Sequence, residues 1–209
     1  MSSILKVDQL QDSGGNAIIT SDGSGNLTPN FNNAGGLVLL NSASGSTSIA
    51  QLDIDSTYIN SSYNNYKLYI NLTSATDTVY LRGRFFVDGT IRSGGTDYSF
   101  NDFRLDSNSR SRGFSDGVNE GRITTEAGVG NETKQRMNCV IDLTDITSTD
   151  QRATCRSWNV FKNNGDSYRH SISAMFLDDD TFPAVNGIRF FFSSGNISAY
   201  DYKLYGVKG

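Results

Sequence analysis

Apolar and polar residues alternate with a period of two along several stretches of the chain. Successive side chains of a β-strand point to opposite faces, so this pattern predicts strands that bury one face in a core. Residues 66–72 and 79–87 show it most clearly, and Gly83 stands on the apolar face of the second run. We expect these two runs to form one hairpin across residues 73–77, with Asp88-Gly89 as a further hairpin-type turn. The apolar positions are Tyr66, Leu68, Ile70, Leu72, Val79, Leu81, Phe85 and Val87.

Short runs of the same kind continue to the end of the chain, with clean alternation over 137–143 and 188–192. Residues 55–65 fit a helical turn, but no window has the 3.6-residue period of a long amphipathic helix. The sequence therefore predicts an all-β fold, a jelly-roll-like antiparallel β-sandwich with an extended N-terminal β arm. The expected strands are 37–42, 47–54, 66–72, 78–87, 98–105, 123–125, 134–143, 152–161, 167–176, 186–193 and 197–207.

The segment Ser107–Asn131 lacks this pattern. It has few large apolar residues and five glycines, which weaken a strand. We expect an exposed loop excursion, the kind of segment that often carries recognition.

Residues 1–33 differ from the rest of the chain. Residues 4–10 fit a strand, and the motif Asp12…Asn16 recurs ten residues later as Asp22…Asn26, which predicts two turns between short strands at 17–20 and 27–28. Such an arm has too little apolar surface to fold alone. It must dock on its own domain, on sister copies or on a larger assembly, and we favour assembly. The residues expected to make these contacts are Ile4, Leu5, Val7, Leu10, Ile18, Ile19, Leu27 and Phe31.

Residues 30–36 read as a linker, so we divide the chain into an anchoring or oligomerisation arm (1–33) and a β-sandwich domain (34–209). Hydrophobic residues make up 36% of the 209 positions, but 12 Phe and 10 Tyr are too many for a disordered chain. With only 2 prolines, the turns must rely on Gly, Asn and Asp.

The net charge of −4 argues against a nucleic-acid-binding protein, which needs a basic face. The opening residues show no signal peptide. The apolar runs 37–40 and 190–192 are far shorter than a membrane span, so we expect no membrane insertion. Cys139 and Cys155 both fall in predicted strands; we interpret them as two buried thiols, with a cross-strand disulfide as the alternative.

One motif resembles a catalytic signature. Gly113-Phe-Ser115-Asp-Gly117 matches the G-x-S-x-G pattern, and an Asp (142, 145, 150 or 166) followed by His170 would complete the hydrolase order. That chemistry needs a buried strand before the serine and a helix after it, whereas both flanks read as loops. We therefore predict no catalytic residue and a non-enzymatic protein.

The remaining candidates for chemistry are also weak. His170 is the only histidine, so a multi-His zinc site is excluded. We interpret it as a hydrogen-bonded histidine at the edge of the core. The run Asp178-Asp-Asp180 lacks the spacing of a calcium loop, so we read it as a solvated acidic turn and expect no metal and no cofactor.

Two groups of side chains are candidates for a binding surface. Arg104, Arg110 and Arg112 are suited to phosphates or acidic glycans, but Asp102 and Asp106 are interleaved with them, and we favour a self-neutralising loop. Aromatic residues around Trp158 are suited to stacking on sugar rings, although such residues more often lie in cores or interfaces. The residues expected to face a receptor are Tyr98, Phe103, Arg110, Arg112, Phe114, Trp158 and Tyr168.

The opening residues 3–26, Ser-Ile-Leu-Lys-Val-Asp-Gln-Leu through Ser-Asp-Gly-Ser-Gly-Asn, resemble the N-terminal cassette of virion structural proteins of tailed phages that infect marine bacteria and cyanobacteria. The runs Tyr66-Lys-Leu-Tyr-Ile, Val79-Tyr-Leu-Arg and Asp88-Gly, and the end of the chain from Ser194 to Lys208, are similar to the β-sandwich domain of these tail-fibre-like proteins. The resemblance is weakest across 107–131.

This resemblance implies a virion structural protein, assembled in the host cytoplasm. As a tail-fibre or adhesin-type appendage, it would form a homotrimer, contact other virion proteins through its arm, and present the sandwich to a host surface glycan. A capsid decoration (cement) protein on the phage head is the alternative, and a neck or baseplate fibre also stays open. A glycan-directed enzyme or lectin, suggested by Ser115, His170 and the aromatic residues, is a third hypothesis.

Overall fold

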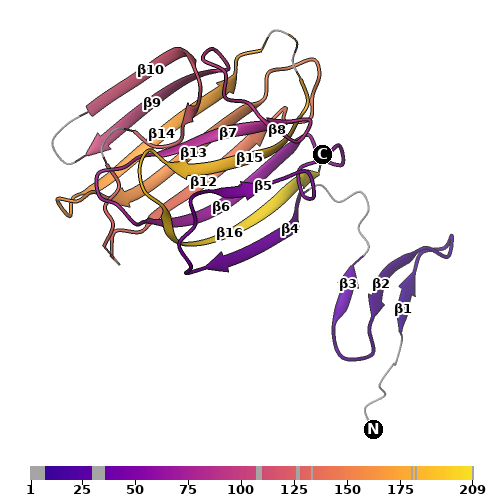
Figure 1. The fold of residues 1–209 in the computed structure, drawn as a ribbon. Helices are drawn as coiled ribbons and strands as arrows, with labels where there is room; N and C mark the ends of the chain where they lie inside the picture. Colours follow the sequence, from indigo (N-terminus) through magenta and orange to yellow (C-terminus); the bar gives the residue numbers. More distant parts are fainter. Residues whose placement is uncertain are drawn as a thin grey trace. The chain divides into compact units, whose positions relative to one another are not determined.

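The computed structural model describes residues 8–29, 36–106, 110–125, 128–132, 134–179, 181 and 183–208. Within these ranges the chain contains strands, bridges and turns but no helix (Figure 1). It forms two compact units, Met1–Gly36 and Leu37–Gly209. The predicted all-β, antiparallel, sandwich-like fold is confirmed.

The first unit is a three-stranded antiparallel sheet of β1 (Gln9–Gln11), β2 (Ala17–Ser21) and β3 (Leu27–Pro29), in that order. Both predicted turns are present and built alike. The Asp12 carboxylate accepts the Gly14 and Asn16 amides at 2.8 and 2.9 Å, and the Asp22 carboxylate accepts the Ser24 amide at 2.7 Å. Hydrogen bonds from the Asn16 and Asn26 side chains lower the pKa of Asp12 and Asp22, respectively.

No side chain between residues 8 and 26 is buried. Leu10 is 52% exposed, and Ile18 and Ile19 are half-buried. Ile4, Leu5, Val7 and Phe31 lie outside the described residues, and the side chain of Leu27 is not described. The apolar residues that can be seen therefore keep much of their surface open.

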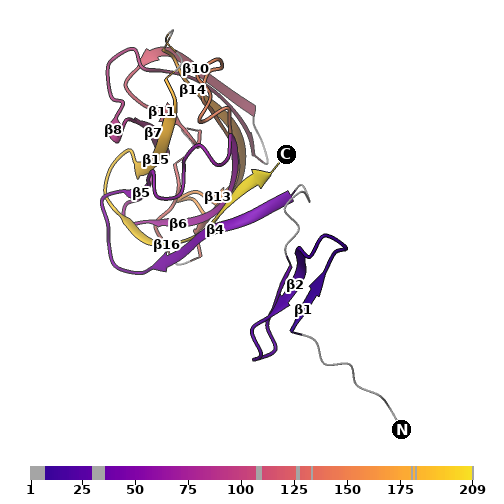
Figure 2. The same cartoon turned by 90° about the vertical axis from the view of Figure 1, so that its right-hand side faces the viewer.

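The second unit consists of two facing antiparallel sheets, seen in two views in Figures 1 and 2. The larger has eight strands in the order β10-β9-β14-β13-β12-β6-β16-β4, and the smaller has the order β11-β7-β15-β5, with β8 paired to β7. The strands of the larger sheet are β4 (Gly36–Gly45), β6 (Asn65–Ser74), β9 (Tyr98–Asp106), β10 (Arg110–Val118), β12 (Met137–Thr144), β13 (Thr154–Lys162), β14 (Tyr168–Leu177) and β16 (Ile197–Lys208). Those of the smaller are β5 (Leu52–Ile54), β7 (Leu81–Val87), β8 (Thr90–Ile91), β11 (Gly121–Arg122) and β15 (Val185–Phe192).

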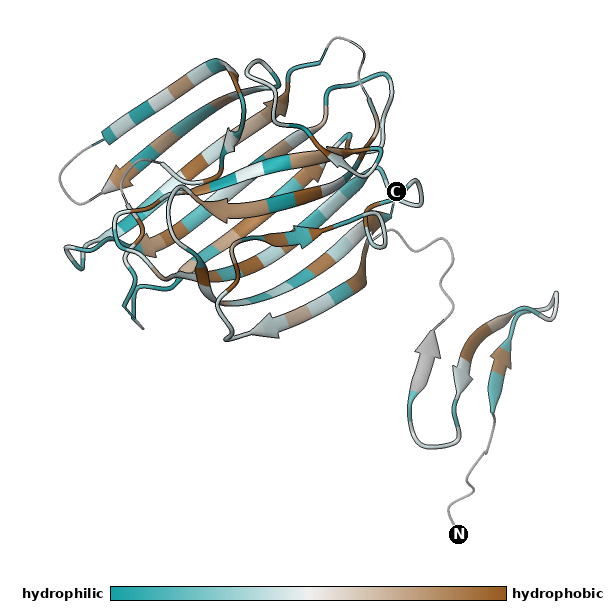
Figure 3. Ribbon diagram, in the orientation of Figure 1, coloured by the Kyte–Doolittle hydropathy of each residue, from teal (hydrophilic) through white to brown (hydrophobic). Residues whose placement is uncertain are grey.

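The core lies between the inner faces of the two sheets. Apolar and polar residues alternate along their strands (Figure 3), and the predicted core positions of β6, β12 and β15 are buried. The period-two pattern thus assigned the correct face to each of these strands. The buried residues of the three strands include Tyr66, Leu68, Ile70, Leu72, Met137, Cys139, Ile141, Leu143, Ile188, Phe190 and Phe192.

The predicted hairpin of residues 66–87 is wrong. β6 pairs with β12 and β16 in the larger sheet, whereas β7 pairs with β15, β8 and β11 in the smaller one. Residues 75–80 therefore cross from one layer to the other. Alternation specifies which face of a strand is buried, but not which strand lies beside it.

The turn at Asp88-Gly89 is confirmed. It links β7 to β8 with φ angles of +50° and +73° at its two central residues. Positive φ at both positions is the geometry of a type I′ turn, which matches the twist of the paired strands.

The prediction of a loop across 107–131 is wrong for residues 110–118 and 121–122, which form strands, whereas the other described residues of the segment lie outside strands. Residues 110–118 form the edge strand β10, paired with β9 from Arg110 to Ser115 and at Val118. Two of the segment's glycines serve close packing: a Cβ on Gly121 would overlap the Met175 side chain, and one on Gly113 would crowd the Asp102 carboxylate. These two glycines mark tight contacts, whereas Gly117 and Gly128 have φ angles of +62° and +67°, which glycine adopts without strain.

Two other predicted strands differ in extent. Residues 47–54 contain only β5 and an isolated bridge from Ile49 to Ile197. Residues 123–125 are buried but follow β11 rather than forming a strand. The helical turn expected in 55–65 is present as a bond from the Ile59 amide to the Asp55 carbonyl, 3.0 Å.

A buried polar cluster attaches the segment after β11 to the larger sheet. The Ile123 carbonyl accepts hydrogen bonds from Ser157 Oγ, Ser173 Oγ and Asn159 Nδ2 at 2.7–2.8 Å. These three donors face inward from β13 and β14. Hydrogen bonds at buried positions hold residues 121–125 in one place beneath the sheet.

Cys139 and Cys155 are buried and free, as the two-thiol interpretation expected. Burial in the core raises the pKa of both thiols. A high pKa means little thiolate, so neither residue is set up as a nucleophile.

Candidate recognition surface

The outer face of the eight-stranded sheet carries a row of large exposed side chains. The strand register places Phe103 opposite Ile172, Ile172 opposite Trp158, and Trp158 opposite Val140. Val140 is in turn opposite Tyr69. The row thus crosses five neighbouring strands, from β9 to β6. Phe103, Ile172, Trp158 and Tyr69 are each more than a third exposed.

A second row beside the first is more polar. Here His170 lies opposite Val160, Val160 opposite Asn138, and Asn138 opposite Asn71. Aromatic and amide side chains are thus neighbours on one surface. A contiguous exposed patch of this kind marks an interaction site more often than single exposed residues do.

Two depressions lie along these rows. One of about 300 Å³ is lined by Tyr69, Asn71, Asn138, Trp158 and His170, among others. The other, of about 480 Å³, lies around Tyr168 and shares Val160 and His170 with the first. Tyr168 is 71% exposed, and the Lys162 ammonium lies 4.9 Å from its ring centroid.

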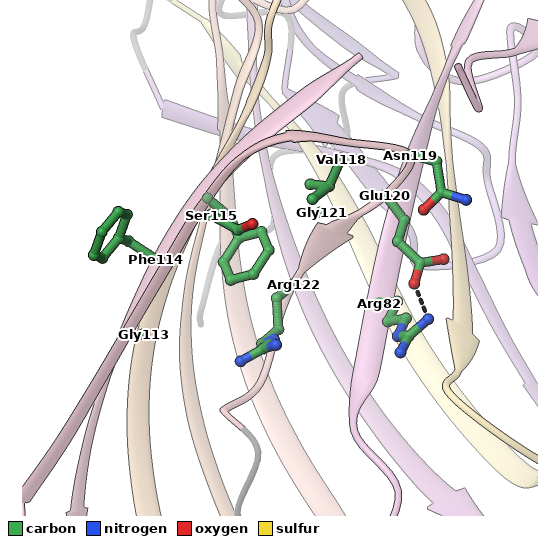
Figure 4. Close-up of a pocket in the computed structure, with 10 residues that line it drawn as sticks. Arg82, Gly113, Phe114, Ser115, Val118, Asn119, Glu120, Gly121 and Arg122 are labelled. Carbon is green, nitrogen blue, oxygen red and sulfur yellow. Dashed lines mark ion pairs between the residues drawn. The ribbon is translucent and has the colours of Figure 1, made fainter. Parts of the chain in front are cut away.

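A third cavity lies at the C-terminal end of β10, where the chain continues into β11. It has a volume of about 320 Å³ (Figure 4). In this view Arg82 and Glu120 form an ion pair on one side, and Phe114 lies on the opposite side. Phe114 is 80% exposed.

The charges of this third cavity are already matched within the protein. Glu120 also pairs with Arg84 at 3.1 Å, and Arg122 pairs with the buried Asp102 at 3.1 Å while its guanidinium lies over the Phe100 ring. A ligand would have to compete with these pairs. The outer face of the large sheet is therefore the better candidate surface.

The prediction that Tyr98 faces a receptor is wrong. It is fully buried, and its hydroxyl bonds to the amide of Phe85 and the carbonyl of Arg92. Tyr98 occupies an inward position of β9, whereas Phe103 occupies an outward one. The two residues lie an odd number of positions apart on one strand, so their side chains point to opposite faces.

The other six residues of that set are exposed. Phe103, Trp158 and Tyr168 lie on the outer face, as do Arg110 and Arg112 of the edge strand. Arg110 and Arg112 form no ion pair with any residue that the structure describes. The Asp102 carboxylate pairs with Arg122 of β11, which lies outside the three arginines of the expected self-neutralising loop. The side chain of Asp106 is not described.

Ser115 and His170 do not form a catalytic pair. Ser115 lies on edge strand β10 opposite Phe100, an inward position, whereas His170 lies opposite Leu105 on the outer face. The two side chains are thus on opposite sides of the sheet. His170 is also not the hydrogen-bonded histidine expected at the core's edge: it is half-exposed, and its side chain forms no hydrogen bond with the described part of the chain.

The acidic turn uses its carboxylates internally. Asp178 pairs with Arg152 and accepts Ser99 Oγ at 2.9 Å, and Asp179 pairs with Arg92. Hydrogen bonds from the Thr181 side chain and amide lower the pKa of Asp179. Asp180 lies outside the described residues. Among the residues that are described, no three His, Cys, Asp or Glu side chains are grouped as metal ligands.

Sequence reasoning missed several residues of the outer face. Leu105, Ile172 and Val160 looked like ordinary strand residues, and Asn71 and Asn138 were not singled out. Parity could have found Asn71 and Asn138, which stand on β6 and β12 at outward positions between apolar inward residues. It gave no such signal for Val160 and Ile172, because the inward positions of β13 and β14 include buried polar residues.

Comparisons with known proteins give only a distant structural likeness. The chain matches no protein-family model and no curated protein. Among solved structures, it is similar to galectin LEC-6 of Caenorhabditis elegans, with 8% sequence identity and a TM-score of 0.31, over 79% of this chain and 96% of that one. No helix among the described residues is long and apolar enough to cross a membrane.

Proposed function

We propose that this protein is a non-enzymatic structural component of a tailed-phage virion, of the tail-fibre or adhesin type. The observation that carries the proposal is the exposed aromatic row on the outer face of the eight-stranded sheet. Strands hydrogen-bonded on both sides form a rigid support for such a row. An adhesin needs this combination of rigidity and open apolar surface.

The N-terminal unit has the assembling role. None of its side chains between residues 8 and 26 is buried, and Leu10, Ile18 and Ile19 keep apolar surface exposed. Three short strands bury too little to be stable alone. Contacts with sister copies, in a homotrimer, and with other virion proteins would supply the missing burial.

The phage assignment rests on the resemblance of the opening cassette and the final strand to tail-fibre-like proteins. Immunogold labelling of intact virions with an antibody to this chain tests it. Labelling of the tail or its fibres is the expected result. Labelling spread over the head would favour the capsid decoration protein instead, and unlabelled virions would overturn both.

A further inference from the structure

The depression around Trp158 has the features of a small-ligand site. Its volume of about 300 Å³ is at the lower end of the range for such sites, roughly 300–1,000 Å³. It lies over β6, β12, β13 and β14, four strands with a partner on each side. Its floor is therefore preorganised, which reduces the entropy lost on binding.

The depression has one aromatic side and one hydrogen-bonding side. Trp158 and Tyr69 lie on the aromatic side, and the Tyr69 ring is held edge-to-face against Tyr205 at 5.9 Å between centroids. Asn71, Asn138 and His170 lie on the other side. A ligand that fits both must itself have an apolar face and a rim of hydroxyl groups.

The polar side chains keep hydrogen-bonding capacity for a ligand. Asn71 Nδ2 donates to Asp201 at 2.8 Å, which orients the amide and leaves its oxygen as an acceptor. Asn138 makes only a long contact of 3.5 Å to the Arg136 carbonyl. No Asp, Glu, Lys or Arg side chain lines the depression, so nothing among its described lining residues compensates a charged ligand.

We infer that this depression binds a neutral saccharide ring, stacked on Trp158 and hydrogen-bonded by Asn71, Asn138 and His170. A pyranose presents C–H groups on its faces and hydroxyls around its rim, which is the complement of this surface. The inference rests on the proposed role of the outer face and gives the ligand of that face a chemical class.

Trp158 is the only tryptophan of the chain, so its fluorescence reports on this site directly. The full-length protein is titrated with the methyl glycosides of glucose, galactose, mannose and N-acetylglucosamine, and with glucuronic acid as the charged counterpart of glucose. We expect a saturable change in emission with at least one neutral glycoside, at a dissociation constant on the order of millimolar. Glucuronic acid is expected to bind no more tightly than glucose.

Two matched variants locate the binding. Asn138→Ala removes one pocket hydrogen bond and is expected to weaken binding about three- to tenfold. Asn101 is also exposed on the outer face but lies outside the depression, so Asn101→Ala is expected to leave the saccharide affinity unchanged. Absence of saturation in a protein that gives a folded NMR spectrum would overturn the inference. Equal binding by the two variants would also overturn it. An emission that changes with protein concentration but not with saccharide would overturn it too, and would indicate that the depression is an interface between copies of the chain.

The titration does not involve the virion, so its outcome separates the two proposals. Saccharide binding together with immunogold labelling of the phage head would overturn the proposed adhesin role and support the saccharide site. Labelling of the tail without saccharide binding would support the adhesin role and overturn the saccharide site.

Discussion

The hydroxyl of Tyr98, on the eight-stranded sheet, accepts a hydrogen bond from the amide of Phe85, on the five-stranded sheet, at 2.7 Å. The same hydroxyl donates to the Arg92 carbonyl at 3.1 Å. One buried side chain thus satisfies the backbone of β7 and joins the two layers of the sandwich. Its phenol contributes to the fold rather than to the surface.

Tyr98→Phe should lower the free energy of unfolding by about 1–3 kcal/mol, because it leaves the buried Phe85 amide without its acceptor. Urea unfolding followed by circular dichroism measures this. Tyr168→Phe is the control, since that ring is exposed, and should change the free energy by less than about 0.5 kcal/mol. Equal effects of the two substitutions would contradict the role of the Tyr98 hydroxyl.

Alkaline pH should destabilise the protein through its two buried thiols. Burial raises the pKa of Cys139 and Cys155 above the usual value of 9.0 in the folded state. As the pH rises, the unfolded chain therefore loses its thiol protons at a lower pH than the folded chain does. The thiols' contribution to the free energy of unfolding is fully present below pH 9 and decreases above it. The expected slope is about 1.4 kcal/mol per pH unit for each thiol.

Urea unfolding at a series of pH values from neutral to alkaline checks this slope. Between about pH 9 and 10, below the ordinary tyrosine pKa of 10.0, Cys139→Val removes one of the two thiols at similar volume and should reduce the slope by about half. At higher pH the buried Tyr66, Tyr98 and Tyr202, whose pKa values are also raised, add to the slope. A wild-type stability that stays constant through this range would show that the thiols are not protected by burial.

Close packing at Gly121 should make the position intolerant of a side chain. A Cβ there would lie 2.6 Å from Met175 Cβ, so Gly121→Ala forces β11 away from the large sheet. We expect a loss of about 1–3 kcal/mol, as for other overpacked cores. Gly95→Ala is the matched control and should cost little, because nothing lies within 4 Å of the place that its methyl group would take.

A melting-temperature series of the two glycine variants and the wild type gives the comparison. If Gly121→Ala has the same melting temperature as the wild type, close packing at this position would be contradicted. Gly121 would then serve the conformational freedom of a loop, as the sequence pattern alone suggests.

The arm should carry the self-association. Ile18 and Ile19 are neighbours on β2 and point to opposite faces of the N-terminal three-stranded sheet. Under the proposed homotrimer, Ile18→Asp or Ile19→Asp, whichever faces the neighbouring copy, should shift the protein from trimer to monomer. Light scattering after size-exclusion chromatography measures the mass directly.

Ser24→Asp, in the exposed second turn, is the control for added charge and should remain trimeric. A monomeric wild-type protein would contradict the proposed assembly, and so would trimers of both isoleucine variants.

Much of the fold followed from residue patterns. The alternation at 66–72, 137–143 and 188–192 identified strands and their buried faces, because a pleated strand facing one core has a strict period of two. The paired Asp and Asn residues of the arm predicted its turns, because these side chains satisfy the turn's own amides.

Pairing between strands was harder to predict. The chain crosses between layers after β6, and no local signal distinguishes such a crossing from a hairpin. Strand β10 was missed because Gly113 and Gly117 looked like loop residues, whereas Gly113 packs against the Asp102 carboxylate of the neighbouring strand β9, a contact that the local sequence does not show. The candidate surface was half predicted: Phe103 and Trp158 were identified, whereas Asn138 and Ile172 became visible only through the register.

The central claim is that the outer face of the eight-stranded sheet makes the contact with the host. Binding of the labelled full-length protein to the bacteria that the virion infects tests it most directly, with Trp158→Ser on that face and Phe191→Ser on the smaller sheet as the matched pair. We predict that Trp158→Ser lowers cell binding about tenfold or more while Phe191→Ser binds as the wild type does. Undiminished binding by a folded Trp158→Ser protein would contradict the claim.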